Sequence, residues 1–504
     1  MSRVWPPATP PGRSPEMGGS LLRLAMALLI GYGALATGLA YWQVVDAERL
    51  STDARNPLVI AAARNAPRGA IYDVNGEVLA RNVRIGGGQL QREYPQPVAA
   101  PVVGYRSIIF GTAGLERAYD AQLTGLSSGS AADDMLRKFR ADPYDPADLR
   151  LSLDVRLQAA AAQQLGDARG VVVAIEPSTG RILAMLSNPT FDPNRIVDPE
   201  RGSRYVARLH QRDDAPLFNR ATQGTYVPGS IFKIVTAGAG LGSGAISRDT
   251  TYEDQPAEYE TGFLVQGFRI RDAPRSVQTD HPLDFLEATE VSSNIWYAHA
   301  SLDIGAQGLL DWAGRFGFGE SIPFDLPTAA SQVTGGGGPL AGFGDRVELA
   351  NAAYGQGQVL VTPLQMACVA ATIANAGVAM RPKLVDELRT ASGHVTRFGP
   401  EAWRTVLDRA DAALIAEAMQ LAVEGQYGRR FAGGARIDGV PVAGKTGTAQ
   451  LSQSEEPHSW FIGFAPADEP QIAIAVIVEN GGSGGERAAP IGGRLMARYL
   501  EFQR

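Results

Sequence analysis

The stretch Tyr226-Val227-Pro228-Gly229-Ser230-Ile231-Phe232-Lys233 decides how the rest of the chain is interpreted. Proline and glycine interrupt regular structure ahead of the serine, and the apolar run that follows predicts a buried helix. Ser230 is therefore expected at or near a helix N-terminus, where unpaired N–H groups and the helix dipole favour negative charge. Because residues three positions apart share a helix face, Lys233 can reach the Ser230 hydroxyl and act as its base. Taken alone, the stretch favours a simpler interpretation, a serine N-cap with a chance lysine one turn later.

Two further stretches change that balance. Ser292-Ser293-Asn294 follows a segment, 283–291, that is typical of a helix, and Lys445-Thr446-Gly447-Thr448 opens a strand-like region. Ser-x-x-Lys, Ser-x-Asn and Lys-Thr-Gly, in this order, form the motif set of serine acyltransferases that react with penicillin. The third motif is the most specific, because the chain has only four lysines among its 46 basic residues. Lysine occurs where an amine that can lose its proton is useful.

Composition limits the other possibilities. A chain of 504 residues with 45% hydrophobic and 20% charged residues predicts a folded protein of two or three domains. Its net charge of −7 gives no reason to expect nucleic-acid binding. The single cysteine, Cys368, excludes an intrachain disulfide and lies in an apolar helical pattern, so we interpret it as a core residue. The five histidines show no metal-ligand spacing, and no metal or cofactor is expected.

An apolar segment near the N-terminus predicts a membrane anchor. Residues 24–45 carry no charge and are long enough to cross a bilayer. Arginines precede the segment and acidic residues follow it, so the N-terminus is expected in the cytoplasm and the catalytic domain outside it. A cleaved signal peptide is the alternative, but the length of the segment and Tyr41-Trp42 at its end favour a retained anchor. Residues 1–23 are expected to form a disordered cytoplasmic tail.

The remaining chain divides into a small and a large domain. Residues 46–150 predict a module with a hairpin turning at Asn75-Gly76, a short helix over 114–125 and a linker over 142–148. Residues 151–504 predict the larger domain. Its expected strands are 151–154, 170–175, 181–186, 445–449, 460–464 and 472–478, and its expected helices include 155–165, 408–424 and 492–502. The polar residues 249–282 are expected near the rim of the site, and the glycine run in 334–339 as a mobile loop.

With these motifs in place, the chain resembles the class B penicillin-binding proteins, the monofunctional peptidoglycan D,D-transpeptidases, from about residue 24 to its end. Further stretches that carry the resemblance are Arg68-Gly69 with Asp73, Gly114-Leu115-Glu116 with Tyr119-Asp120, Ala174-Ile175-Glu176-Pro177, Phe191-Asp192-Pro193-Asn194, Asn219-Arg220-Ala221 and Tyr354-Gly355-Gln356-Gly357. The resemblance implies an α+β fold, an antiparallel sheet flanked by helices. It also implies a small β-rich N-terminal pedestal or dimerisation-like module and one transmembrane helix.

The resemblance also implies roles for the motif residues. Ser230 attacks the D-Ala-D-Ala carbonyl of a peptidoglycan stem peptide, and Lys233 is its base. Ser292 and Asn294 relay the proton and hold the peptide amide. Lys445 is a catalytic residue that sets the local potential, and the substrate-binding residues are Thr446, Gly447 and Thr448, of which Thr446 and Thr448 hold the terminal carboxylate. The backbone N–H groups of Ser230 and Thr448 form the oxyanion hole. Beta-lactams mimic the donor, and which group is the true base is disputed across such enzymes.

Alternatives and partners follow from the same comparison. A D,D-carboxypeptidase or a beta-lactamase uses the same motifs but transfers the acyl group to water, and a membrane-bound beta-lactam sensor or an inactive scaffold would not turn over. The stretch before Ser230 holds the hairpin module in place of the glycosyltransferase domain of a class A enzyme. Members of the family commonly partner with a multi-span SEDS glycan polymerase, in division or in elongation, and Gly31, Gly33, Ala34 and Gly38 could seat a partner helix.

Overall fold

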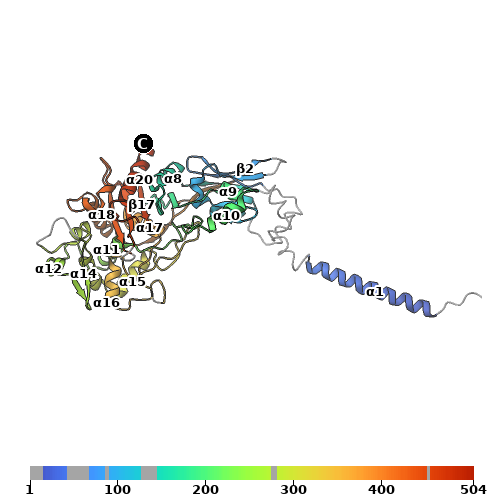
Figure 1. Cartoon of the computed structure of the whole chain (residues 1–504), viewed down its shortest axis with the longest axis horizontal. Coiled ribbons are helices and arrows are strands. Elements are labelled where there is room, and N and C mark those ends of the chain that lie inside the picture. Colours follow the sequence, from blue (N-terminus) through green and yellow to red (C-terminus); the bar gives the residue numbers. More distant parts are fainter. Residues whose placement is uncertain are drawn as a thin grey trace, which may run out of the picture. The chain divides into compact units, whose positions relative to one another are not determined.

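The computed structural model describes residues 15–42, 67–85, 90–125, 145–273, 281–335, 337–450 and 455–504. These residues belong to two compact units. The first unit contributes helix α1 (Pro15–Ala40), and the second contains all described residues from Pro67 onward (Figure 1).

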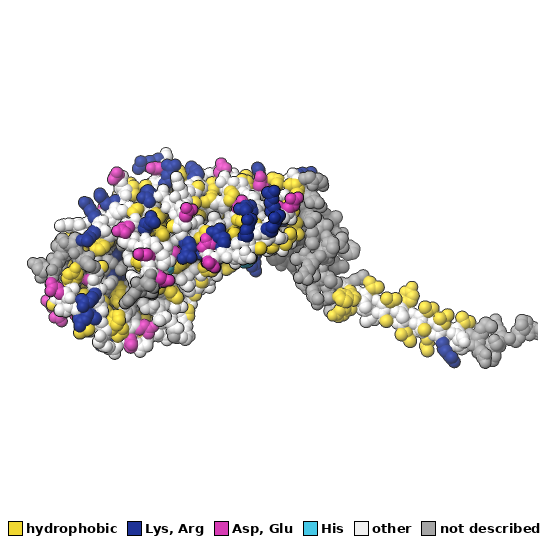
Figure 2. Space-filling model, in the orientation of Figure 1, with side chains coloured by type: hydrophobic (Ala, Val, Ile, Leu, Met, Phe, Trp, Pro, Cys, Tyr) yellow, Lys and Arg dark blue, Asp and Glu magenta, His cyan; other side chains and the backbone are white. Residues whose placement is uncertain are grey.

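Helix α1 is the only described helix that is both long and apolar enough to cross a membrane, over Gly19–Ala40. Hydrophobic side chains cover the face of α1 that Figure 2 shows. The segment overlaps the predicted span over 24–45, of which residues 43–45 lie outside the described residues. The predicted disordered tail is wrong for Pro15–Arg23, because a helix nucleated in the apolar segment gains one hydrogen bond for each residue it adds. Residues 1–14 lie outside the described residues.

The centre of the second unit is a five-stranded antiparallel sheet in the order β15-β16-β17-β7-β8. Its strands are β15 (Ala443–Ala449), β16 (His458–Ala465), β17 (Ile472–Val478), β7 (Gly170–Ile175) and β8 (Ile182–Asn188), which confirms five predicted strands. Every residue of β17 is buried, and its side chains alternate between two hydrophobic clusters. One cluster contains α17 (Pro363–Ala374), and the other contains α8 (Val155–Leu165) and α20 (Ala488–Phe502). The sheet is therefore flanked by helices on both faces, as expected.

A second, six-stranded sheet has the order β13-β12-β6-β1-β2-β3. Its strands are β1 (Ile71–Tyr72), β2 (Val78–Arg84), β3 (Leu90–Glu93), β6 (Ala147–Leu151), β12 (Val385–Thr390) and β13 (Val395–Arg397). The hairpin predicted at Asn75-Gly76 joins β1 to β2, and Gly76 has the positive φ of 88° that such a turn needs. Strand β6 begins at Ala147, earlier than the predicted strand over 151–154, because it pairs with both β1 and β12. The predicted linker over 142–148 therefore ends inside a strand.

The N-terminal part of this unit is held by a buried charge network. Glu116 is fully buried and accepts hydrogen bonds of 2.6 Å from both Arg68 Nε and Arg92 Nε. Burial raises the pKa of this carboxyl, but the charges of Arg92 and Arg68 outweigh burial and hold the pKa below its ordinary value. The predicted helix over 114–125 is found as two short helices, α5 (Gly114–Ala118) and α6 (Asp120–Thr124), which end at Gly125 as expected.

Four further helices lie around the predicted motifs. They are α11 (Lys233–Ser243), α13 (Phe285–Glu290), α14 (Asn294–Ile304) and α18 (Arg409–Glu424). The other described helices and turns are η3 (Pro97–Ala99), α4 (Ala100–Val103), α9 (Pro193–Val197), α10 (Gly202–His210), α12 (Gln255–Thr261), α15 (Ala306–Arg315), α16 (Arg346–Ala353), α19 (Arg429–Ala432) and η5 (Gly433–Ala435). The remaining described strands form the pairs β4 (Tyr105–Ser107) with β5 (Gly111–Ala113), β9 (Phe263–Val265) with β10 (Phe268–Ile270), and β11 (Val378–Met380) with β14 (Ala402–Thr405). Cys368 lies buried in α17, where burial raises the pKa of its thiol to about 12, so it is a core residue as expected.

Candidate active site

Ser230 lies in a short 3-10 turn, η4 (Gly229–Phe232), that leads directly into α11. The prediction of a helix start at this serine is confirmed. Strand β15 runs against this turn so closely that a Cβ added to Gly447 would lie 2.5 Å from the Pro228 carbonyl oxygen. Only glycine allows this approach. The Lys-Thr-Gly strand and the serine turn are thereby brought together.

The residues just before Ser230 are fixed by side chains from other strands. Trp460, on β16, donates its indole N–H to the Val227 carbonyl oxygen at 3.0 Å. The Tyr226 hydroxyl donates to Glu479 Oε1 at 2.8 Å, and Arg220 Nε donates to the same oxygen at 2.9 Å. Trp460 near the start of β16 and Glu479 just after β17 lie at the same end of this antiparallel pair and hold the chain before Ser230, so the orientation of the serine does not depend on the turn alone.

Lys233 is fully buried and its Nζ lies within hydrogen-bond distance of four oxygens. Two belong to groups that can only accept: the Ser292 carbonyl at 2.7 Å and Asn294 Oδ1 at 2.8 Å. The other two are hydroxyls that can also donate: Ser230 Oγ at 3.1 Å and Ser292 Oγ at 3.2 Å. A neutral amine has two N–H donors and one lone pair, so it can donate to the two carbonyl-type oxygens and accept a proton from a hydroxyl. The same oxygens can accept from an ammonium with three N–H donors, so the site accommodates both the charged form of Lys233 and the neutral form that a general base requires.

Ser292 connects the three motifs. Its backbone has a φ of 60°, a left-handed conformation uncommon for a residue other than glycine. In this conformation both its carbonyl oxygen and its hydroxyl contact Lys233 Nζ. Its hydroxyl also accepts a hydrogen bond from Lys445 Nζ at 2.8 Å. Ser292 Oγ thus lies between two lysine amines and can pass a proton from one side to the other.

Lys445 is almost fully buried on β15, the edge strand of the central sheet. Burial lowers the pKa of its amine to about 7, since a charged group is costly away from water. The next residues continue along the strand: Thr446 and Gly447 are buried and Thr448 is exposed. Thr448 Oγ1 accepts a hydrogen bond from the Gly484 backbone at 3.3 Å. The strand therefore presents the predicted binding residues beside Ser230.

Asp272 is a residue of the site that sequence reasoning missed. Its Oδ1 accepts hydrogen bonds from the backbone of Asn294 at 2.5 Å and of Ile295 at 2.9 Å, and its Oδ2 accepts one from Ser293 Oγ at 2.8 Å. The neighbouring Arg271 carbonyl accepts a hydrogen bond from Asn294 Nδ2 at 2.9 Å, which turns Oδ1 of that side chain toward Lys233. The polar segment expected near the rim thus supports the second motif, although its composition gave no signal for Asp272.

Tyr297 is a second missed residue. It follows Asn294 by three positions on α14, so helix spacing could have placed it on the same face. Its fully buried ring lies with its centroid 5.6 Å from Lys233 Nζ and forms an apolar wall beside the amine. Among the residues that the structure describes, no group of His, Cys, Asp or Glu side chains is arranged to hold a metal ion.

Two family models match this chain. The penicillin binding protein transpeptidase domain matches residues 170–497, and the penicillin binding protein A dimerisation domain matches residues 68–145. The first range contains all three motifs, and the second contains the hairpin and the Glu116 network. The fold and the site therefore define a penicillin-binding transpeptidase domain preceded by a dimerisation-type module.

Similar proteins agree with these matches. The chain is 35% identical to the peptidoglycan D,D-transpeptidase PbpA of Mycolicibacterium smegmatis, over 96% of this chain and 99% of the relative. It is 33% identical to the peptidoglycan D,D-transpeptidase MrdA of Acinetobacter baumannii, over 79% of this chain and 65% of the relative. The structure of penicillin-binding protein A from Mycobacterium tuberculosis as a penicillin G acyl-enzyme complex covers 86% of this chain and 100% of its own, with a TM-score of 0.75 and 32% identity. The chain belongs to the class B penicillin-binding proteins, which confirms the resemblance drawn from its motifs.

Proposed function

We propose that Ser230 is the nucleophile with which this class B penicillin-binding protein crosslinks peptidoglycan stem peptides. The observation that carries the assignment is the 3.1 Å contact between Lys233 Nζ and Ser230 Oγ, in a site where Lys233 can exist as a neutral amine. Ser230 Oγ attacks the D-Ala-D-Ala carbonyl carbon as its proton passes to Lys233 Nζ, and a C–O bond forms. The tetrahedral intermediate then releases D-Ala and leaves an acyl-enzyme.

The leaving amine needs a proton, and Ser292 supplies the route. Its hydroxyl contacts Lys233 Nζ at 3.2 Å and Lys445 Nζ at 2.8 Å, so the proton taken from Ser230 reaches the departing nitrogen as the C–N bond breaks. Asn294 holds Lys233 through Oδ1 and positions the peptide amide. An amine of a second stem peptide then attacks the acyl-enzyme. The same groups accept the proton of this amine and return a proton to Ser230 Oγ as the acyl group leaves the serine.

The edge strand β15 binds the donor. Lys445 supplies positive potential when protonated, and Thr446 and Thr448 hold the terminal carboxylate while Gly447 keeps the strand close to the serine turn. The backbone N–H groups of Ser230 and Thr448 stabilise the oxyanion. A beta-lactam acylates the same serine, as the acyl-enzyme complexes named for the Mycobacterium tuberculosis relative suggest for this chain.

Helix α1 is the proposed single-pass membrane anchor of the chain. We infer that α1 lies in the cell membrane with the N-terminus in the cytoplasm, and that residues 46–150 form a pedestal for the transpeptidase domain, 151–504, outside it. Gly31, Ala34 and Gly38 are spaced three and four positions apart, so they lie on one face of α1. This face of small residues suits a second membrane helix, and a SEDS-family glycan polymerase is the partner we propose.

The decisive experiment supplies the full-length protein in detergent with a D-Ala-D-Ala donor peptide, with and without an amine acceptor. A transpeptidase forms the crosslinked product when the acceptor is present, and Ser230→Ala abolishes it. Hydrolysed donor alone, whatever the acceptor concentration, would assign the protein to the D,D-carboxypeptidases. Co-purification from membranes with a multi-span polymerase tests the partner, and loss of that partner on substituting Gly31 with Leu tests the helix face.

A further inference from the structure

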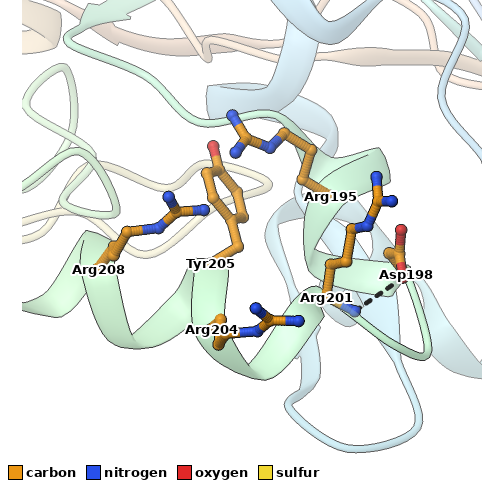
Figure 3. Close-up of a pocket in the computed structure, with 6 residues that line it drawn as sticks. All are labelled: Arg195, Asp198, Arg201, Arg204, Tyr205 and Arg208. Atoms are coloured by element: carbon orange, nitrogen blue, oxygen red, sulfur yellow. Dashed lines mark hydrogen bonds between the residues drawn. The ribbon is translucent and has the colours of Figure 1, made fainter.

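A pocket of about 430 Å³ lies on helices α9 and α10 and shares no residue with the serine site. Six residues line it: Arg195, Asp198, Arg201, Arg204, Tyr205 and Arg208. Figure 3 shows that Arg195 comes from α9 and that Arg204, Tyr205 and Arg208 project from α10 on the side that faces it. Four of the six lining side chains are therefore guanidinium groups.

The local charge is opposite to that of the whole chain. The protein has a net charge of −7, yet the pocket lining holds four arginines and one aspartate, which gives 4 − 1 = +3. Within the described residues, none of the four pocket arginines forms an ion pair with a carboxylate. Asp198, the one acidic residue of the lining, accepts hydrogen bonds of 2.9 Å from the backbone N–H groups of Glu200 and Arg201. The pocket therefore carries positive charge that its own residues do not neutralise.

This arrangement does not stabilise the helix. Arg204 and Arg208 are four positions apart on one face of α10, and Arg201, the residue that precedes the helix, is three positions before Arg204, so like charges repel along this face. A solvated helix face would account for one or two such residues. It does not account for the fourth guanidinium, Arg195, which a separate helix brings to the same pocket.

The pocket has a fixed floor and an additional donor. Beneath it, Phe191, Ile196, Val206 and Leu209 form a buried cluster with residues of the N-terminal module. The Tyr205 hydroxyl accepts a hydrogen bond from the Asp192 backbone at 2.9 Å, so its own O–H remains a donor. Arg195 stacks over the Tyr205 ring at 4.2 Å, which orients the guanidinium without using its N–H groups.

We propose that this pocket binds a phosphate group. A guanidinium group can form paired hydrogen bonds to the oxygens of a phosphate. A phosphate ester or a diphosphate can carry more than one negative charge, whereas a carboxylate carries a single negative charge to set against four arginines. The phosphate belongs either to an anionic lipid headgroup or to a soluble phosphate ester. This inference is independent of the function proposed for Ser230.

The test measures binding of inorganic diphosphate to the full-length protein in nanodiscs by calorimetry at constant ionic strength. Arg201→Gln combined with Arg204→Gln should weaken binding at least about tenfold, since two charge-assisted contacts are lost. The matched control is Arg409→Gln with Arg430→Gln, which removes two other exposed arginines that have no ion pair within the described residues. The control should stay within about twofold of the wild type.

Two lipid compositions distinguish the sources of the phosphate. If the pocket binds lipid headgroups, diphosphate should bind more weakly in nanodiscs of phosphatidylglycerol than in nanodiscs of phosphatidylcholine. Equal binding in the two lipids would assign the pocket to soluble phosphate esters. Equal binding of diphosphate by the wild type and the pocket variant would overturn the proposal. Displacement of diphosphate by acetate, added at the same total concentration of negative charge, would also overturn it. Penicillin labelling of every variant reports the fold of the serine site separately, and Arg208→Gln provides a second pocket variant should the double substitution fail to fold.

Discussion

The carboxylate of Asp272 accepts a hydrogen bond from the hydroxyl of Ser293 at 2.8 Å, and this contact joins a polar excursion to the Ser-x-Asn motif. The same carboxylate accepts from the first backbone N–H groups of α14, where the helix dipole favours negative charge. Ser292 and Asn294 flank Ser293, and both contact Lys233. The position of the second motif against the first therefore depends on a residue that neither motif contains.

Asp272→Ala should slow acylation by penicillin about tenfold or more, because Asn294 and Ser292 lose their support and a misplaced catalytic group is costly. Asp272→Asn should reduce the acylation rate less, since its amide oxygen can still accept hydrogen bonds from the backbone at the start of the helix. The measurement is the rate of labelling with a fluorescent penicillin. Asp408→Ala is the matched control: Asp408 caps α18 by accepting from the Asp411 backbone at 2.8 Å. Its loss should cost about 1 kcal/mol of stability and leave acylation unchanged. Equal rates for Asp272→Ala and the wild type would show that Asp272 has no positioning role.

Ser230→Ala should abolish covalent labelling while the protein stays folded, because Ser230 supplies the hydroxyl that lies both at the start of α11 and within hydrogen-bond distance of Lys233. Ser292→Ala should slow labelling without moving its site, since we propose that Ser292, which contacts Lys445 Nζ, relays a proton and does not form the bond. Mass spectrometry of the labelled peptide checks both results. Label found on a folded Ser230→Ala protein would refute the assignment of Ser230 as the nucleophile.

Lys233→Arg should reduce acylation by roughly 10²–10⁴-fold, the usual contribution of a general base, because a guanidinium does not lose its proton in proteins. The positive charge is retained, so a role as a mere counter-charge predicts little change. A melting curve must accompany the rate, because Lys233 is fully buried and arginine is larger. Lys383→Arg is the matched control, since that lysine forms an ordinary ion pair with Asp386 at 3.0 Å. Near-normal acylation by folded Lys233→Arg would transfer the role of base to another group, such as Ser292.

Lys445 makes the stability of the protein depend on pH in a predictable direction. Burial lowers the pKa of its amine to about 7 from the ordinary 10.5, so between these values the unfolded chain binds one more proton than the native chain. The free energy of unfolding should then rise with pH by up to about 1.4 kcal/mol per unit across that window, and the cost of burying the lysine is complete below pH 7. Lys445→Met removes this contribution. The gain in the free energy of unfolding of Lys445→Met over the wild type, measured by chemical denaturation, should be greatest near pH 7 and shrink toward pH 10. An advantage that stays constant with pH would contradict the lowered pKa.

The sequence by itself determined the elements that local physics controls. The break at Pro228-Gly229 and the apolar run behind it placed the start of a helix at Ser230, because capping and spacing act within one turn. Asn75-Gly76 specified a hairpin, since only such residues accept positive φ without strain. Continuous apolar runs such as Ile472–Val478 predicted buried strands. The order of the three motifs was enough to indicate the family and to single out Ser230 as the proposed nucleophile.

Only the tertiary structure decided how these parts meet. Strand β6 begins at Ala147 because it pairs with β1 and β12, partners whose distance along the chain leaves no local signal. Ser292 Oγ contacts both Lys233 and Lys445, and the low pKa of Lys445 arises from burial between elements that are remote in sequence. Asp272 has no motif around it, and its role exists only because the fold places its carboxylate at the N-terminus of α14. Spacing and turn chemistry act over a few residues, whereas burial and long-range hydrogen bonds appear only when the chain has folded.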